Sequence, residues 1–297
     1  MPSPLGVGII GLGTMGAPMA RNLAKAGFRL SVATRTAAKA QALAAEIGGA
    51  AKAFERFSDV GRASDVLVTC LPDAPEVELV LFGPSGAGEG LGSGAIVIDC
   101  STIAAESARG MAARLSARGV FLLDAPVSGG QKGAIEGTLT FFVGGDAAAL
   151  ERARPVLQAM GKRITHLGPS GSGQLGKATN QILVAGNLIA LSEAMAFAAR
   201  VGLPLPALHE ALSSGAANSW ALEVLGKKML DRDFRPAFAV KHQQKDLAIV
   251  LRTAREKGVP LPGTALVHQL LSALEAQGRG EDGTQALLTL YEQLEGR

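Results

Sequence analysis

Short, mostly apolar runs alternate with longer segments of mixed character over the first 167 residues. The runs lie near residues 5–10, 28–34, 50–53, 65–71, 95–99 and 120–123. Apolar runs of this length are typical of strands that are buried on both faces. The segments between them have the length and spacing of amphipathic helices, except that the glycine-rich run 82–94 predicts mostly loop. This alternation predicts a parallel sheet with covering helices.

The pattern changes near residue 138. Two further strands are expected at 139–143 and 163–166, with a helix at 147–160 between them. Residues 168–173 (GPSGSG) read as a linker, and no strand is predicted beyond it. Helices are expected at 174–201, 206–212, 220–230, 238–257, 263–277 and 284–295. We therefore predict an α/β domain over residues 1–167 and an all-helical domain, for substrate binding and dimerisation, over residues 168–297.

Composition narrows the class of protein. The 297 residues are 47% hydrophobic and 19% charged, as in a globular protein of about two domains. The net charge is only +3, and the sequence contains no Lys/Arg-rich run, so no nucleic-acid partner is expected. Cys70 and Cys100 follow apolar strands and are expected as buried, reduced thiols, and no Cys/His spacing predicts a metal. With no leader segment, and with polar residues in the apolar stretch 182–201, we expect a cytoplasmic protein without a membrane partner.

Three glycines follow the first apolar run, at Gly11, Gly13 and Gly16, and helix-like sequence follows them at once. In this strand–turn–helix setting, the first glycine allows the tight turn, the second lets a pyrophosphate approach, and the third lets helix and strand pack closely. The helix N-terminus favours the anion. The turn, with Leu12, Thr14 and Met15, thus predicts a dinucleotide cofactor on a Rossmann-type, doubly wound domain. A plain structural turn is the alternative.

The residues after the second predicted strand bear on the choice of cofactor. An acidic residue there would hold the ribose 2′-hydroxyl of NAD. The chain instead has Arg35, Thr36 and Lys39, with no acid among them. A guanidinium and a hydroxyl suit a 2′-phosphate, so NADP(H) is favoured over NAD(H). An ordinary threonine helix cap with exposed cations is the alternative.

Ligands in open α/β sheets bind beyond the carboxyl ends of the strands. Leu71, Pro72 and Thr102 follow two such ends and are candidates for the ribose and nicotinamide end of the cofactor, although Ser101 or Thr102 could simply cap a helix. Ser128, Gly129 and Gly130 follow a third strand end. They would form a small anion nest suited to a carboxylate, unless the loop merely needs glycine.

Lys177 and Asn180 share a face at the start of the long predicted helix. Glycines precede them and leave room for a ligand. Hydride delivery to a carbonyl needs a proton donor, and a lysine beside a nicotinamide can serve. Asn180 could orient the substrate or the lysine. Lys245 and Asp246, taken alone, read as an exposed ion pair.

Four ordered motifs together identify a family resemblance. They are GLGTMGAPMA from Gly11, DAPVSGG from Asp124 with Gly133 and residues 137–139, Gly173-x-x-x-Lys177-x-x-Asn180, and KDL from Lys245. Over nearly its whole length the chain resembles the β-hydroxyacid dehydrogenases, the group of 3-hydroxyisobutyrate dehydrogenase, tartronate semialdehyde reductase and glyoxylate/succinic semialdehyde reductase.

The resemblance implies roles for these residues. Lys177 would be the catalytic acid/base, Ser128, Gly129 and Gly130 would hold the substrate carboxylate, and Asn180 would contact substrate. Lys245 would reach the active site, near both substrate and cofactor. The expected activity is an NADP-preferring interconversion of a short 3-hydroxy acid, or a related hydroxy acid, and its semialdehyde, in a homodimer or homotetramer. An imine or ketone reductase, or a non-catalytic dinucleotide-binding protein, are the alternatives, and Lys177 argues against both.

One departure leaves the substrate open. The semialdehyde reductases are expected to carry an Arg shortly after the second Phe of a Phe-x-Pro-x-Phe motif. Here Phe234-Arg235-Pro236-Ala237-Phe238 is followed by Ala239. Residues 216–220 are expected to border the pocket and look similar to the tartronate semialdehyde reductase segment.

Overall fold

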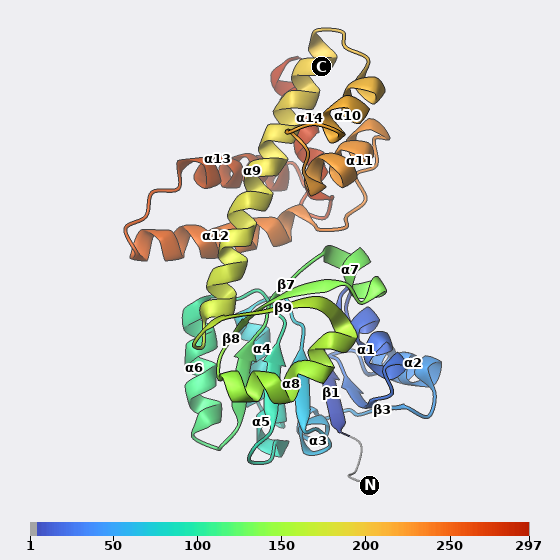
Figure 1. The fold of residues 1–297 in the computed structure, drawn as a ribbon, viewed down its shortest axis with the longest axis vertical. Helices are drawn as coiled ribbons and strands as arrows, with labels where there is room; N and C mark the ends of the chain where they lie inside the picture. Colours follow the sequence, from blue (N-terminus) through green and yellow to red (C-terminus); the bar gives the residue numbers. More distant parts are fainter. Residues whose placement is uncertain (1–4, 297) are drawn as a thin grey trace. The chain divides into compact units, whose positions relative to one another are not determined.

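The structure, a computed structural model, describes residues 5–296 and consists of two compact units (Figure 1). Unit 1 ends at Lys177 and unit 2 begins at Ala178. This division lies inside a long helix, ten residues after the domain boundary predicted from the sequence.

Unit 1 is built on a mixed sheet. Its strands are β1 (Gly6–Ile10), β2 (Arg29–Ala33), β3 (Ala51–Ala53), β4 (Val66–Thr69), β5 (Ile96–Asp99), β6 (Phe121–Asp124), β7 (Val127–Ser128), β8 (Leu139–Gly144) and β9 (Gly161–Gly168). The order is β3-β2-β1-β4-β5-β6-β8-β7, with β9 also paired to β8. From β3 to β6 all pairs are parallel, whereas β8 runs antiparallel to β6 and β7. The doubly wound α/β prediction is confirmed, and β8 makes the sheet mixed.

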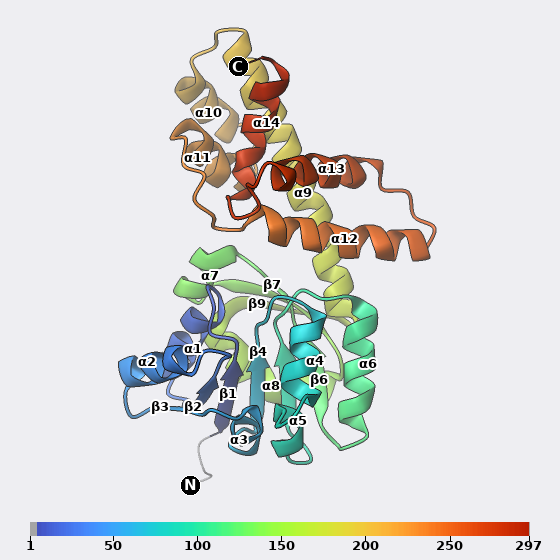
Figure 2. The ribbon, with the colours of Figure 1, turned by 180° about the vertical axis from the view of Figure 1, so that it is seen from behind.

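Helices cover both faces of this sheet (Figures 1 and 2). They are α1 (Gly16–Lys25), α2 (Ala37–Ile47), α3 (Phe57–Arg62), α4 (Ala74–Phe82), α5 (Ala87–Gly90), α6 (Ala105–Ser116), α7 (Gly130–Glu136) and α8 (Ala147–Met160). Side chains alternate between the faces, as a strand requires: Val66 and Val68 pack with α1, α2 and α8, and Leu67 packs with α3 to α6. Because β1, β4, β5 and β6 pair in parallel, their carboxyl ends share one edge of the sheet.

Three short elements, α5, β7 and α7, were not predicted. Helix α5 lies in the segment expected to be mostly loop. Its glycines serve close packing, because a Cβ on Gly90 would lie 1.9 Å from the carbonyl oxygen of Ser58 in α3. Strand β7 and the start of α7 lie in the loop expected after β6.

Unit 2 is helical, as predicted. Its elements are the remainder of α9 (Ser172–Arg200), then α10 (Leu205–Ser213), a π-helical segment η1 (Ala221–Gly226), α11 (Lys227–Leu230), α12 (Val240–Glu256), α13 (Pro262–Ala276), a 3₁₀ turn η2 (Thr284–Ala286) and α14 (Leu287–Leu294). Within residues 178–296, β pairing is limited to one isolated bridge between Ala239 and Gly283. Leu188, Val240 and Leu271 are among the side chains of its core.

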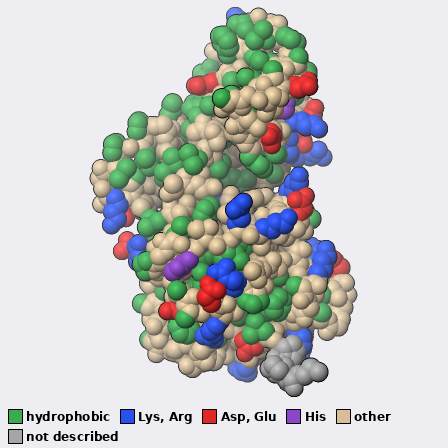
Figure 3. All heavy atoms as spheres, viewed as in Figure 1, with side chains coloured by type: hydrophobic (Ala, Val, Ile, Leu, Met, Phe, Trp, Pro, Cys, Tyr) green, Lys and Arg blue, Asp and Glu red, His purple; other side chains and the backbone are tan. Residues whose placement is uncertain are grey.

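Helix α9 is long and apolar enough to cross a membrane by length and composition. Three of its polar side chains nevertheless bond to other elements: Gln174, Lys177 and Gln181. Such bonds are those of a helix packed inside protein. On the face drawn in Figure 3, hydrophobic side chains gather over unit 2, and Leu183 and Phe197 of α9 are exposed. The oligomeric state stays a prediction.

Candidate cofactor and active site

The glycine turn joins β1 to α1, and its three glycines meet different surroundings. Gly11 has φ +100°, and a Cβ there would lie 2.3 Å from the carbonyl oxygen of Cys70. A Cβ on Gly16 would lie 1.8 Å from the carbonyl oxygen of Gly11. The protein's own packing thus requires both glycines. A Cβ on Gly13 would meet nothing within 4 Å. Internal packing does not explain the glycine there, whereas a ligand lying against the turn does, so the turn fits a dinucleotide pyrophosphate.

Arg35, Thr36 and Lys39 lie between the end of β2 and the first turn of α2, and all three are exposed. Thr36 occupies the N-cap position of α2, but its side chain makes no capping hydrogen bond. The helix-cap alternative therefore does not account for Thr36. The backbone N–H of Gly11 donates to the carbonyl of Ala33 at 3.2 Å, which ties the end of β2 to the glycine turn.

The loops after β4 and β5 are joined by Ser101. Its Oγ accepts a hydrogen bond from the N–H of Leu71 at 2.9 Å and donates to Asp99 Oδ1 at 2.6 Å. The N-cap of α6 is Ala104, so neither Ser101 nor Thr102 caps that helix. The alternative interpretation of these two residues is wrong. The structure instead places the loops that carry Leu71 and Thr102 side by side.

Asp99 lies beneath these loops and is fully buried. Oδ1 accepts from Thr69 Oγ1 at 2.8 Å and from Ser101, while Oδ2 has no partner among residues 5–296. Burial raises the pKa of Asp99 to about 6, against the effect of these hydrogen bonds, and the neighbouring carboxylate of Asp124 raises it further. Asp99 is a residue that sequence reasoning missed.

Asp124, at the end of β6, anchors the start of α9. Its Oδ1 accepts from the N–H of Gly171 at 2.7 Å, and Oδ2 accepts from the N–H of Gln174 at 3.0 Å. The amide of Gln174 then bonds the loop after β5. Its Nε2 donates to the carbonyl of Ser101 at 2.8 Å, and its Oε1 accepts from the N–H of Ile103 at 3.1 Å. These two bonds lie on either side of Thr102.

Lys177 lies beside the segment that follows β6. It is 8% exposed, and its Nζ donates to the carbonyl of Val127 at 2.9 Å. The adjoining Gly129 and Gly130 both have positive φ, +121° and +59°, and a Cβ on Gly130 would meet nothing within 4 Å. Within unit 1 the structure therefore brings Lys177 together with the segment of Ser128, Gly129 and Gly130.

In unit 2, Asn180 and Lys245 are linked through two buried side chains. Asn180 Nδ2 donates to Gln181 Oε1 at 2.8 Å, and Gln181 Nε2 donates to Asp246 Oδ2 at 2.7 Å. Lys245 Nζ lies 3.0 Å from Asp246 Oδ1. The Asp246 side chain is only 3% exposed, so the expectation of an exposed ion pair is wrong. The pair lies on α12, and Gln181 of α9 bonds Asp246. The roles of Asn180 and Lys245 stay predictions.

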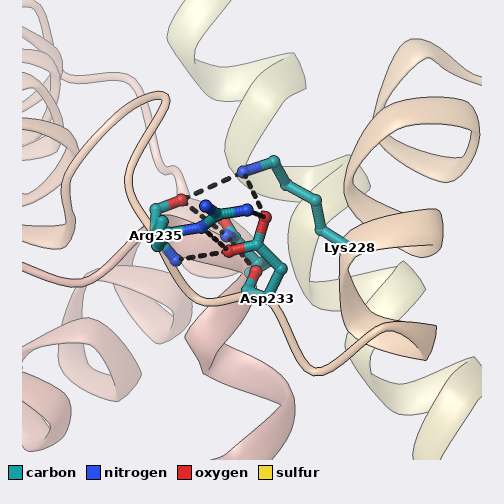
Figure 4. Close-up of polar contacts among 4 residues, drawn as sticks. Lys228, Asp233 and Arg235 are labelled. Atoms are coloured by element: carbon teal, nitrogen blue, oxygen red, sulfur yellow. Dashed lines mark hydrogen bonds and ion pairs between the residues drawn. The ribbon is translucent and has the colours of Figure 1, made fainter.

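The loop between α11 and α12 carries the Phe-x-Pro-x-Phe motif. Asp233 accepts hydrogen bonds from the side chain and backbone N–H of Arg235, and Lys228 pairs with it at 3.3 Å (Figure 4). The Arg235 guanidinium, and then Lys228, hold the pKa of Asp233 well below its usual range. Ala239, where the semialdehyde reductases are expected to have Arg nearby, is buried and bridged to Gly283. In the segment 216–220, Trp220 is exposed.

The two thiols are free: Cys100 is buried as predicted, and Cys70 is half-buried. Burial, and then the charge of Asp99, raise the pKa of Cys70 to about 12. Residues 5–296 contain no group of three or more His, Cys, Asp or Glu that could hold a metal.

Comparisons with known proteins agree with this geometry. Residues 6–168 match the NAD-binding domain of 6-phosphogluconate dehydrogenase, and residues 171–291 match the family described as NAD-binding of NADP-dependent 3-hydroxyisobutyrate dehydrogenase. The Escherichia coli 2-hydroxy-3-oxopropionate reductase is 41% identical over 286 residues, covering 96% of this chain and 97% of that protein. A probable 3-hydroxyisobutyrate dehydrogenase-like protein of Arabidopsis thaliana is 40% identical over 294 residues, covering 99% and 87%.

A solved structure of 3-hydroxyisobutyrate dehydrogenase from Salmonella typhimurium superposes with a TM-score of 0.88 at 32% identity, over 96% of this chain and 99% of that one. Fold, glycine turn and relatives together define an NAD(P)-dependent oxidoreductase. More narrowly, the chain belongs to the β-hydroxyacid dehydrogenase family and is an NAD(P)-dependent hydroxyacid dehydrogenase. This family membership removes the non-catalytic alternative.

Proposed function

We propose that this enzyme interconverts a short 3-hydroxy acid, or a related hydroxy acid, and its semialdehyde, that it prefers NADP(H), and that Lys177 is its general acid/base. One observation carries the proposal. The nearly buried Lys177 donates to the carbonyl of Val127, immediately before the open, left-handed turn at Gly129 and Gly130. An ammonium group is thereby held beside a turn whose shape suits a carboxylate.

The residues that we propose for cofactor binding lie in turns and loops that follow the parallel strands of unit 1. Gly11, Leu12, Gly13, Thr14, Met15 and Gly16 would hold the pyrophosphate, with Gly13 giving it room. Arg35, Thr36 and Lys39 would bind the 2′-phosphate, since three exposed donors and no acid stand there. Leu71, Pro72 and Thr102 would face the nicotinamide end. When bound, the nicotinamide supplies or accepts the hydride.

The chain's own residues would orient the substrate and move the proton. Ser128 and the N–H groups of Gly129 and Gly130 would hold the carboxylate. During reduction, the Lys177 ammonium would give a proton to the oxygen of the carbonyl as it becomes a hydroxyl, and in oxidation the amine would take it back. We propose that Asn180 and Lys245, held by Gln181 and Asp246, also contact the substrate.

Two lysine variants test the assignment. Lys177→Ala should lower turnover by roughly 10² to 10⁴ with little change in NADPH affinity, because the proton donor is lost and the cofactor residues remain. Lys177→Arg should not restore the rate, because a guanidinium stays protonated near neutral pH. Lys132→Ala is the matched control, since that lysine lies on α7, two residues after Gly130, and its side chain is 81% exposed.

Substrates are screened by following NADPH absorbance with glyoxylate, succinic semialdehyde, methylmalonate semialdehyde and tartronate semialdehyde, which is the 2-hydroxy-3-oxopropionate of the E. coli relative's name. A near-normal rate in either Lys177 variant would remove this lysine from the mechanism. Absence of activity with all four semialdehydes would contradict the proposed substrate class.

A further inference from the structure

Gln174 is a buried side chain with an unusual set of partners. It is 3% exposed and lies in the first turn of α9. Both polar atoms of its amide bond backbone groups of the loop after β5, as donor to Ser101 and as acceptor from Ile103. An amide paired in this way binds the loop as a neighbouring strand would.

The two bonds enclose a single residue, Thr102. The peptide groups on both sides of Thr102 cannot rotate without breaking a buried hydrogen bond, and a buried backbone group without a partner is unfavourable. The other side of the loop is held by Ser101, which bonds Asp99 and Leu71. The backbone on both sides of Thr102 is therefore held from outside its own loop, by Gln174.

The backbone of Gln174 is fixed as well. Its N–H donates to Asp124 at the end of β6. Lys177 follows three residues later on the same helix, which places it about one turn further along. One residue therefore connects the Thr102 loop to the helix that carries Lys177, with the end of β6 as a common anchor.

We propose that Gln174 is a positioning residue, which holds Thr102 against the nicotinamide end of the cofactor in register with Lys177. The inference rests on the proposed function, in which Thr102 faces that end. It makes a specific claim about binding: loss of the Gln174 amide should weaken the hold on the nicotinamide and spare the adenosine end, which other loops bind.

The test compares two ligands on the intact protein. Gln174→Met keeps the approximate length of the side chain and removes both hydrogen bonds. Dissociation constants are measured by calorimetry for NADPH and for 2′-phospho-ADP-ribose, which is the same molecule without the nicotinamide. We expect the variant to bind NADPH about tenfold more weakly, as for the loss of one well-placed interaction, and 2′-phospho-ADP-ribose within about twofold of wild type.

A matched control separates positioning from general loosening of the fold. Gln285 is 1% exposed, and its amide likewise bonds loop carbonyls, those of Asp233 and Arg235 in unit 2. Gln285→Met should lower the thermal midpoint in a similar way while leaving both dissociation constants unchanged. The inference would be overturned if Gln174→Met had an NADPH dissociation constant within twofold of wild type, or if the variant bound both ligands more weakly by the same factor.

Gln174→Glu keeps the proposal testable if the methionine variant fails to fold. A carboxylate at this position still accepts from Ile103 but cannot donate to Ser101, whereas a protonated carboxyl can do both. The NADPH affinity of Gln174→Glu, divided by that of wild type at the same pH, should therefore rise as the pH is lowered. A ratio that does not change with pH would contradict the inference. Loss of the general-acid role, seen as full activity in Lys177→Ala, would leave this binding contrast intact, so the two failures are distinguishable.

Discussion

Replacing the three glycines of the β1–α1 turn by alanine, one at a time, should separate packing from ligand binding. A Cβ on Gly11 or Gly16 would overlap backbone oxygens, those of Cys70 and Gly11. A Cβ on Gly13 would meet no atom within 4 Å. Gly11→Ala and Gly16→Ala are therefore expected to damage the fold, and Gly13→Ala is expected to damage cofactor binding alone.

The expected losses in the free energy of unfolding differ enough among the three variants to be measured. At Gly11, a φ of +100° adds backbone strain of about 1–3 kcal/mol for a residue with a Cβ, and the 2.3 Å approach adds the cost of moving the chain. Gly16→Ala forces its Cβ to within 1.8 Å of a backbone oxygen, so the turn must open. We expect each to lower the free energy of unfolding by more than about 2 kcal/mol. Gly13→Ala should change it by less than about 0.5 kcal/mol.

Two measurements check this prediction. Urea unfolding without cofactor gives the free energy of unfolding, and calorimetric titration gives the NADPH dissociation constant. Gly13→Ala should bind NADPH at least about tenfold more weakly, which corresponds to about 1.4 kcal/mol. Wild-type NADPH affinity in Gly13→Ala would refute the inference that this glycine makes room for the pyrophosphate. Destabilisation of this variant as large as that of Gly11→Ala would refute the packing argument.

Two further predictions concern charge. Wild type should prefer NADPH over NADH by at least about tenfold in kcat/KM, and Arg35→Asp should invert that order because a carboxylate repels the 2′-phosphate; an unchanged ratio would make Arg35 an exposed cation without a binding role. The raised pKa of Asp99, about 6, means that the folded protein holds this proton more tightly than the unfolded chain does. The free energy of unfolding should therefore fall as the pH rises from about 4 to about 6, by up to about 3 kcal/mol. Asp99→Asn should reduce this slope in pH-dependent urea unfolding. A slope of the same sign should remain from Asp124, whose pKa is also raised by burial, and equal slopes in wild type and variant would contradict the assignment.

The parts of the fold that were predictable are those encoded locally. The β1 strand, its glycine turn and α1 follow one another in sequence, and a buried run next to an amphipathic segment needs no distant partner to be recognised. The direction of β8 could not be predicted, because pairing with β6 is a tertiary choice that leaves no periodic signature. Strand β7, with two residues, and α5, with four, are too short for any period to show.

The candidate site divides in the same way. Lys177 and the Ser128–Gly130 segment belong to recognisable motifs, and the structure brings them together. Asp124 and Gln174 were missed because their partners are backbone groups that are distant in sequence, which a single sequence does not reveal. Asp99 was missed because its burial depends on tertiary packing, and its partner Thr69 lies on the neighbouring strand β4. A signal was nonetheless present: Gln174, Lys177 and Gln181 are spaced by three and four along α9, so they lie on one face of that helix.

That polar stripe would let one helix serve the three tasks that we propose for its residues. A long polar side chain on a buried helix face is unfavourable unless each polar atom finds a partner. Gln174 and Lys177 find theirs in the loops after β5 and β6 of unit 1, and Gln181 finds its partner, Asp246, in α12 of unit 2. The residues that would position the cofactor, move the proton and orient the substrate thus follow one another along two turns of α9, and their spacing is set by the helix itself. The rigidity of a helix, rather than of any loop, is what would keep Gln174 and Lys177 at a constant spacing within unit 1.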